Sequence, residues 1–206
     1  RARGAGDKFT LNGRVRAVAL ADSCDGLVVA GELNAGNALF YLTRDSAGLT
    51  IENRTQADGS SASTLIFESV VLADDALLGA GADAEQALAH ARCLAQLATS
   101  AYLVGLAEQV FEITLDYLRT RQQFGRAIGT FQALQHRAVD LYIQKTLAIA
   151  VLDEALATFD AADSMALRQR AASRAKFRAN EAALVIARQA VQLHGGMGYT
   201  DECDVG

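Results

Sequence analysis

Two short stretches, RQQFG at residues 121–125 and QLHGGMGY at residues 192–199, carry the most informative chemistry of this chain. The first brings a guanidinium (Arg121), side-chain amides and an aromatic ring together. The second contains Gly195–Gly196, where the backbone has no side chains. An arginine binds pyrophosphate oxygens through two parallel N–H groups, and consecutive backbone N–H groups can hold an anion. The two stretches therefore predict a site for a flat, phosphorylated ligand.

The composition excludes several classes of protein. Of 206 residues, 51% are apolar and 21% are charged, which is typical of one large or two small globular domains. The net charge of -5 argues against a nucleic-acid partner. No apolar run reaches the roughly 18 residues of a membrane span, and no signal peptide is visible. Cys24, Cys93 and Cys203 form no CxxC pair, so we expect free thiols in the cytoplasm and no metal site.

The first part of the chain has the pattern of short strands. Asn12–Gly13 lies between Phe9–Leu11 and Arg14–Arg16, which predicts a hairpin with a two-residue turn. Further runs rich in β-branched and aromatic residues, separated by turn residues, are found at Leu27–Ala30, Ala38–Leu42, Leu49–Glu52 and Thr64–Leu72. This spacing predicts an antiparallel sheet or a piece of a barrel.

The period becomes helical from Ala84, and the absence of proline suits long helices. The first helix should turn Leu94, Leu97, Ala98, Ala101 and Gly105 to the core. A second helix from Phe131 to about Phe159 should bury Leu141, Ala148, Ile149, Leu152, Ala155, Leu156 and Phe159. A third, starting near Asp163–Ser164 and ended by Gly195–Gly196, should bury Ala175, Ala179, Ala182, Ile186, Ala190 and Leu193.

The predicted fold class is therefore α+β, an antiparallel β-sheet or barrel piece followed by an antiparallel helical bundle. We place the domain boundary at residue 83, which gives a β domain at 1–83 and a helical domain at 84–206.

The spacing Tyr117-(x3)-Arg121-(x2)-Phe124-Gly125-(x6)-Gln132, followed by Gln192-(x2)-Gly195-Gly196-(x)-Gly198, resembles the C-terminal half of the acyl-CoA dehydrogenases. Those are FAD enzymes that desaturate acyl-CoA thioesters. The resemblance implies that the strands are the later part of the middle β domain. The helices would be most of the C-terminal helical domain, and the N-terminal helical domain would be absent from this chain.

The resemblance also implies a cofactor and partners. FAD would contact Arg121, Gln123, Phe124, Ile128, Gln132, Gln192, Gly195 and Gly196, and His194 is a further candidate. Because the flavin would be held mainly by a neighbouring subunit, we expect a homo- or hetero-oligomer, typically a dimer of dimers. The substrate would be an acyl-CoA, and electron-transfer flavoprotein is the family's usual partner.

The catalytic base of such an enzyme is not visible. Removal of the α-proton needs a carboxylate. The resemblance places that Glu either beyond Gly206 or at Ala95–Gln96 on the first helix, where neither residue is an acid. Glu108, Glu112 and Asp116 form a ridge that we expect to be solvated. Three functions stay open: an active dehydrogenase, a non-catalytic subunit that completes a partner's FAD site, and a flavin-free helical scaffold.

Overall fold

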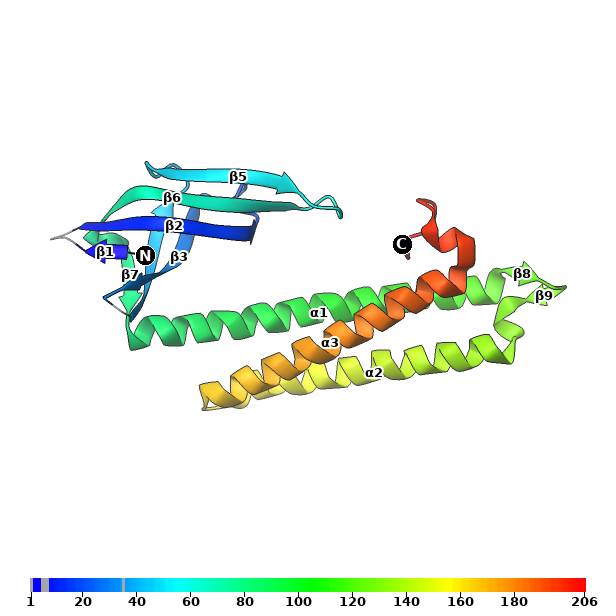
Figure 1. Cartoon of the computed structure of the whole chain (residues 1–206). Coiled ribbons are helices and arrows are strands. Elements are labelled where there is room, and N and C mark those ends of the chain that lie inside the picture. The colour runs from blue at the N-terminus through cyan, green and yellow to red at the C-terminus, as the bar shows by residue number, and fades with distance from the viewer. Residues whose placement is uncertain (1, 5–7, 35) are drawn as a thin grey trace. The chain divides into compact units, whose positions relative to one another are not determined.

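The computed structural model describes residues 2–4, 8–34 and 36–206, which divide into two compact units, residues 1–88 and 89–206 (Figure 1). The division falls inside a long helix, later than the domain boundary that we placed at residue 83. The observed fold is the predicted one, antiparallel sheets followed by a bundle of three long helices.

The first unit contains two antiparallel sheets. One has the order β1 (Ala2–Gly4), β2 (Lys8–Ala19), β6 (Ser61–Ala73), β5 (Leu49–Thr55). The other has the order β3 (Gly26–Leu33), β4 (Gly36–Thr43), β7 (Leu77–Ala80), with a short 3₁₀ helix, Asp74–Ala76, before its last strand. The predicted strands at 27–30, 38–42, 49–52 and 64–72 all lie within observed strands.

The two sheets share one core. Phe9 of β2 meets Phe40 of β4 edge to face, with ring centroids 5.3 Å apart. Around this pair lie further buried side chains from both sheets, Leu11, Leu42, Leu65, Phe67, Val70 and Leu72. Burial of aromatic and aliphatic side chains between facing sheets is the main stabilising contribution here.

The hairpin predicted at Asn12–Gly13 is wrong. β2 runs straight through these residues and pairs with β6 along its length, with a register shift between Leu11 and Gly13. The Asn12 side chain accepts a hydrogen bond from the backbone N–H of Ser69 at 2.8 Å. Because these residues pair with the long strand β6, the sequence that favours a turn forms a β-bulge instead.

The second unit is built from α1 (Ala82–Thr120), whose first residues up to Leu88 belong to the first unit, and from α2 (Gln132–Ala161) and α3 (Met165–His194). A two-stranded hairpin, β8 (Gln122–Gln123) and β9 (Arg126–Ala127), and a 3₁₀ turn, Ile128–Thr130, connect α1 to α2. Another 3₁₀ turn, Gly195–Tyr199, follows α3. Among the described residues, the helices all lack the length of apolar sequence that a membrane crossing requires.

The core faces of α2 and α3 follow the predicted stripes. All six predicted residues of α3 are buried, as are Leu141, Ala148, Leu152 and Ala155 of α2. Ile149 and Phe159 are partly buried, and Leu156 is an exception at 42% exposed. Ser164 lies at the start of α3 as predicted, although its side chain makes no capping hydrogen bond.

The predicted core face of α1 is wrong by one residue. Leu97 is buried, but Leu94 is 48% exposed, and Ala98, Ala101 and Gly105 are exposed too. The buried residues recur in steps of three and four at Cys93, Leu97, Ser100, Val104, Ala107, Phe111, Thr114 and Leu118. Residues 93–107 contain no charge on any face of the helix, so the pattern could not distinguish the two sides.

Candidate functional site

Arg121 stands directly after the last residue of α1, where the backbone is held from two sides. Its N–H donates to the carbonyl oxygen of Tyr117 at 2.8 Å, and its own carbonyl accepts from the N–H of Ile128 at 2.9 Å. Figure 1 shows β8 and β9 just beyond this end of α1. The root of the hairpin is thus fixed while the Arg121 side chain stays exposed.

Phe124 and Gly125 form the two-residue turn of this hairpin. Both have positive φ, 52° and 78°, as the tight turn favoured between twisted antiparallel strands requires. Glycine adopts this conformation freely, but for a bulky residue it costs on the order of 1 kcal/mol. Phe124 is nevertheless 89% exposed. A strained and exposed aromatic residue points to a contact with something outside the chain.

Residues 126–131 hold the hairpin in place. The Phe131 ring meets Phe124 edge to face with centroids 6.0 Å apart, and the Arg126 guanidinium lies 4.2 Å from the Phe131 centroid. Ile128 packs against the helical core. A Cβ on Gly129 would lie 2.7 Å from the Leu118 carbonyl oxygen, so this stretch runs tightly against α1. Sequence reasoning missed Arg126 and Phe131, although an aromatic residue directly before Gln132 was a usable signal.

Gly195, Gly196 and Gly198 follow α3, and the structural reason for having glycine differs among these positions. Gly195 ends the helix with φ 62°, and its N–H donates to the Gln192 carbonyl. A Cβ on Gly198 would lie 2.8 Å from the Val191 carbonyl oxygen. Gly196 has neither reason, because its φ is not positive and a Cβ there would meet nothing within 4 Å. The bare backbone at Gly196 suits the close approach of a group that is not part of this chain.

The two motifs are joined by an aromatic contact. The rings of Tyr117 and His194 are stacked with centroids 4.2 Å apart, and the Tyr117 hydroxyl donates to the His194 carbonyl at 3.3 Å. His194 is 4% exposed, and its Nδ1 lies 2.8 Å from the Ala190 carbonyl oxygen. His194 is therefore an interior residue in this structure and not the open cofactor contact that its place in the glycine motif suggested.

Of the eight predicted cofactor residues, Ile128 is half-buried and the others are exposed: Arg121, Gln123, Phe124, Gln132, Gln192, Gly195 and Gly196. They lie at the ends of α1 and α3 and at the start of α2. Their contacts with a ligand stay a prediction.

Residues 79–206 match the family model of the acyl-CoA dehydrogenase C-terminal domain. The chain belongs to the acyl-CoA dehydrogenase family. Members of this family bind FAD.

Similarity extends over the whole chain. The human mitochondrial short-chain specific acyl-CoA dehydrogenase is 28% identical over 212 residues, which cover 98% of this chain and 50% of that protein. Acyl-CoA dehydrogenase IpdE2 of Mycolicibacterium smegmatis is 40% identical over 111 residues, 54% of this chain and 33% of that protein. The chain thus spans half or less of the length of these two relatives.

A solved structure with the same fold is the ChsE4–ChsE5 complex of Mycobacterium tuberculosis. It matches with a TM-score of 0.87 and 27% identity, covering 97% of this chain and 53% of that one. Relatives of this acyl-CoA dehydrogenase chain therefore form complexes of two different chains, and others belong to complexes with electron-transfer flavoprotein.

The two positions of α1 at which the resemblance places a catalytic Glu carry no carboxylate. Ala95 is exposed and Gln96 is half-buried, and their carbonyls accept the hydroxyls of Thr99 and Ser100. Of the acidic ridge, Glu112 and Asp116 are exposed, as predicted, whereas Glu108 is half-buried. The carboxylates of Glu112 and Asp116 are 55% and 74% exposed and pair with Lys145 at 3.1 Å and Arg119 at 3.0 Å. Among the described residues, no group of His, Cys, Asp and Glu side chains could hold a metal ion.

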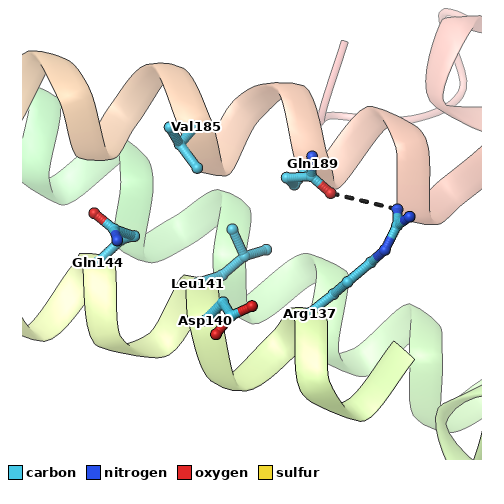
Figure 2. A pocket seen from close by; sticks show the side chains of 6 residues that line it. All are labelled: Arg137, Asp140, Leu141, Gln144, Val185 and Gln189. Carbon is cyan, nitrogen blue, oxygen red and sulfur yellow. Dashed lines mark hydrogen bonds between the residues drawn. The ribbon is translucent and has the colours of Figure 1, made fainter. Parts of the chain in front are cut away.

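A hollow of about 330 Å³ lies between α2 and α3 (Figure 2). Arg137 donates to the Gln189 side chain across it at 3.5 Å. The other lining residues are Asp140, Leu141, Gln144 and Val185. None of the predicted cofactor residues lines this hollow, and it brings together no pair of carboxylates.

Proposed function

We propose that this chain is part of an FAD-dependent acyl-CoA dehydrogenase that introduces an α,β double bond into an acyl-CoA thioester. In that reaction the α-proton goes to a carboxylate base, and FAD, when bound, accepts the β-hydrogen as hydride. The observation that carries the proposal is that the two motifs combine an open backbone at Gly196, where an added Cβ would meet no described atom within 4 Å, with a strained Phe124 that is 89% exposed.

Each residue of the site has a role that fits the cofactor. Arg121 would bind the pyrophosphate through its two parallel N–H groups. Phe124 would lie against a flat ring, and the amides of Gln132 and Gln192 would donate hydrogen bonds. The backbone beside Gly196 would lie close to a phosphate or ribose. We assign no residue the role of catalytic base.

The site faces outward, which supports a cofactor shared between subunits. A side chain that is 89% exposed at a hairpin tip buries itself only against another molecule. We therefore propose an oligomer, a dimer of dimers, in which Arg121 and Phe124 reach a flavin held mainly by the neighbouring subunit. Electron-transfer flavoprotein would take up the electrons. Three free cysteines support a cytoplasmic location.

A second function is favoured by one observation. Ala95 and Gln96 stand where the resemblance places a Glu, so a non-catalytic subunit that completes a partner's FAD site is the alternative. The ChsE4–ChsE5 complex of two different chains supports this alternative.

The substitution Arg121→Ala tests the shared part of both functions. It should weaken FAD binding about 10- to 100-fold, the loss expected for a hydrogen-bonded charge pair, with little change in melting temperature because the side chain is exposed. The matched control is Arg119→Ala, which removes the same charge two residues away, from a surface pair with Asp116. The dissociation constant is measured by titrating FAD into the full-length protein together with any partner that co-purifies. Equal affinities in all three proteins would contradict the proposal.

A second measurement separates the two functions. About one FAD per chain, bleached anaerobically by acyl-CoA, supports a self-sufficient dehydrogenase. About half an FAD per chain, with a second polypeptide present and no bleaching until that polypeptide is added, supports the non-catalytic subunit. Absence of flavin from every preparation would leave only the scaffold function.

A further inference from the structure

We infer that Tyr117 and His194 are a positioning pair, which holds the arginine end of α1 and the glycine turn after α3 in the arrangement that binds one diphosphate-bearing ligand. The inference rests on the proposed function, because that ligand is the proposed FAD. It adds the half-buried Tyr117 and the buried His194, neither of which is itself expected to touch the cofactor.

Tyr117 acts on both motifs at once. Its backbone carbonyl accepts the Arg121 N–H at 2.8 Å, which sets where the chain leaves α1. Its hydroxyl, 77 residues away from its partner in sequence, donates to the His194 carbonyl at 3.3 Å. That carbonyl belongs to the peptide bond leading into Gly195, so the hydroxyl orients the first peptide of the glycine turn.

The His194 side chain is held by a hydrogen bond and by ring stacking. Because a carbonyl oxygen only accepts, the Nδ1 atom 2.8 Å from the Ala190 oxygen carries the proton. The ring is buried and lies against Tyr117 with an angle of 26° between the planes. A 180° flip of the His194 ring would keep the stacking but break the hydrogen bond to Ala190, so this bond selects one orientation of the ring.

Packing alone does not require these two residue types. Two apolar side chains would bury as much surface between α1 and α3 without orienting a peptide. The hydroxyl directed at the carbonyl before Gly195 is the feature that an apolar pair would lack, so its removal separates positioning from packing.

The substitution Tyr117→Phe removes that hydroxyl and keeps the stacked ring. We expect FAD to bind about fivefold more weakly, the loss expected of one neutral hydrogen bond, at a temperature where the protein is fully folded by circular dichroism. The matched control is Tyr142→Phe, which removes a hydroxyl from a half-exposed ring on α2 and should leave the affinity unchanged. His194→Phe, which keeps an aromatic ring but loses the bond to Ala190, should weaken binding similarly and serves if Tyr117→Phe does not fold.

Tyr117→Phe combined with Arg121→Ala completes a double-mutant cycle. If Tyr117 positions the glycine turn relative to Arg121, its loss should matter much less once the guanidinium is gone. Equal effects in both backgrounds, or unchanged affinity in Tyr117→Phe and His194→Phe while Arg121→Ala still weakens binding, would overturn the positioning pair alone. A wild-type protein that binds no FAD would overturn it together with the proposed function.

Discussion

At the scale of single residues, the glycine turn separates a glycine required by the fold from one that we assign to a ligand. A methyl group on Gly198 would meet the Val191 backbone at 2.8 Å, whereas one on Gly196 would meet nothing. We expect Gly198→Ala to destabilise the protein by about 1–3 kcal/mol, because backbone atoms cannot give way as a flexible side chain does.

Gly196→Ala should leave the free energy of unfolding unchanged or raise it by up to about 1 kcal/mol, since alanine has less freedom in the unfolded chain. The same methyl group should obstruct the cofactor and lower the FAD content strongly. Thermal melts and the flavin absorbance of the two variants check both expectations. A Gly196→Ala protein with normal flavin would place the ligand elsewhere.

Phe124 offers a second test at this scale. Asparagine tolerates the left-handed conformation better than alanine does, so Phe124→Asn should be about 0.5–1 kcal/mol more stable than Phe124→Ala. Both variants lose the edge contact with Phe131, which therefore cancels in the comparison. Both should also lose FAD affinity, as measured by titration. An asparagine variant that binds flavin as wild type does would refute a role for the aromatic ring.

At the scale of elements, α1 has two apolar sides, of which only one is part of the core. Leu97 is 4% exposed and Leu94 is 48% exposed. We expect Leu97→Ala to destabilise the chain by about 2–5 kcal/mol through the cavity it leaves. Leu94→Ala, the same change on the other side, should cost less than about 1 kcal/mol in the isolated chain. Urea denaturation of the two variants gives the comparison, and equal losses would mean that the assigned core face is wrong.

This pair also shows how far the sequence predicts the fold. The order of strands and helices and the core stripes of α2 and α3 follow from periodicity. Polar and charged residues mark the outer face of α3, whereas α2 also exposes apolar side chains such as Val139, Ile143 and Leu147. The face of α1 did not follow, since residues 93–107 are uncharged all round. The Asn12–Gly13 hairpin failed because pairing with β6, far away in sequence, decided the local conformation.

The residues of the candidate site stay a prediction, and the sequence did not indicate how they are arranged. Spacing and resemblance pointed to Arg121, Phe124 and Gly196. Neither indicated that Tyr117 stacks on His194 or that Phe131 and Arg126 support the hairpin, because these contacts depend on how the helices pack. Nor did the letters alone distinguish Gly198, which close packing against Val191 requires, from Gly196, which no contact of the described residues requires.

At the scale of the whole molecule, the second side of α1 predicts association. Its exposed residues include Leu94, Tyr102 at 72% and Leu106 at 46%, with no charge between residues 93 and 107. An apolar face of this kind is usually buried against another polypeptide. It therefore supports the proposed oligomer.

We expect Tyr102→Glu to lower the assembly mass in sedimentation velocity while helicity stays unchanged, because an unpaired carboxylate is costly to bury. Gln169→Glu, which adds the same charge at an exposed position of α3, is the control and should sediment as wild type does. Unchanged mass in both variants would place the subunit contact on another surface.

The strained turn at Phe124 also has an evolutionary consequence. A position that weakens the free protein is kept only while selection for its bound state continues. In lineages that have given up the cofactor, substitutions to glycine or asparagine at 124 should therefore accumulate early, well before changes at Leu118, which packs inside the bundle. The residue at this one site could then serve as a marker, across genomes, of which descendants still use flavin.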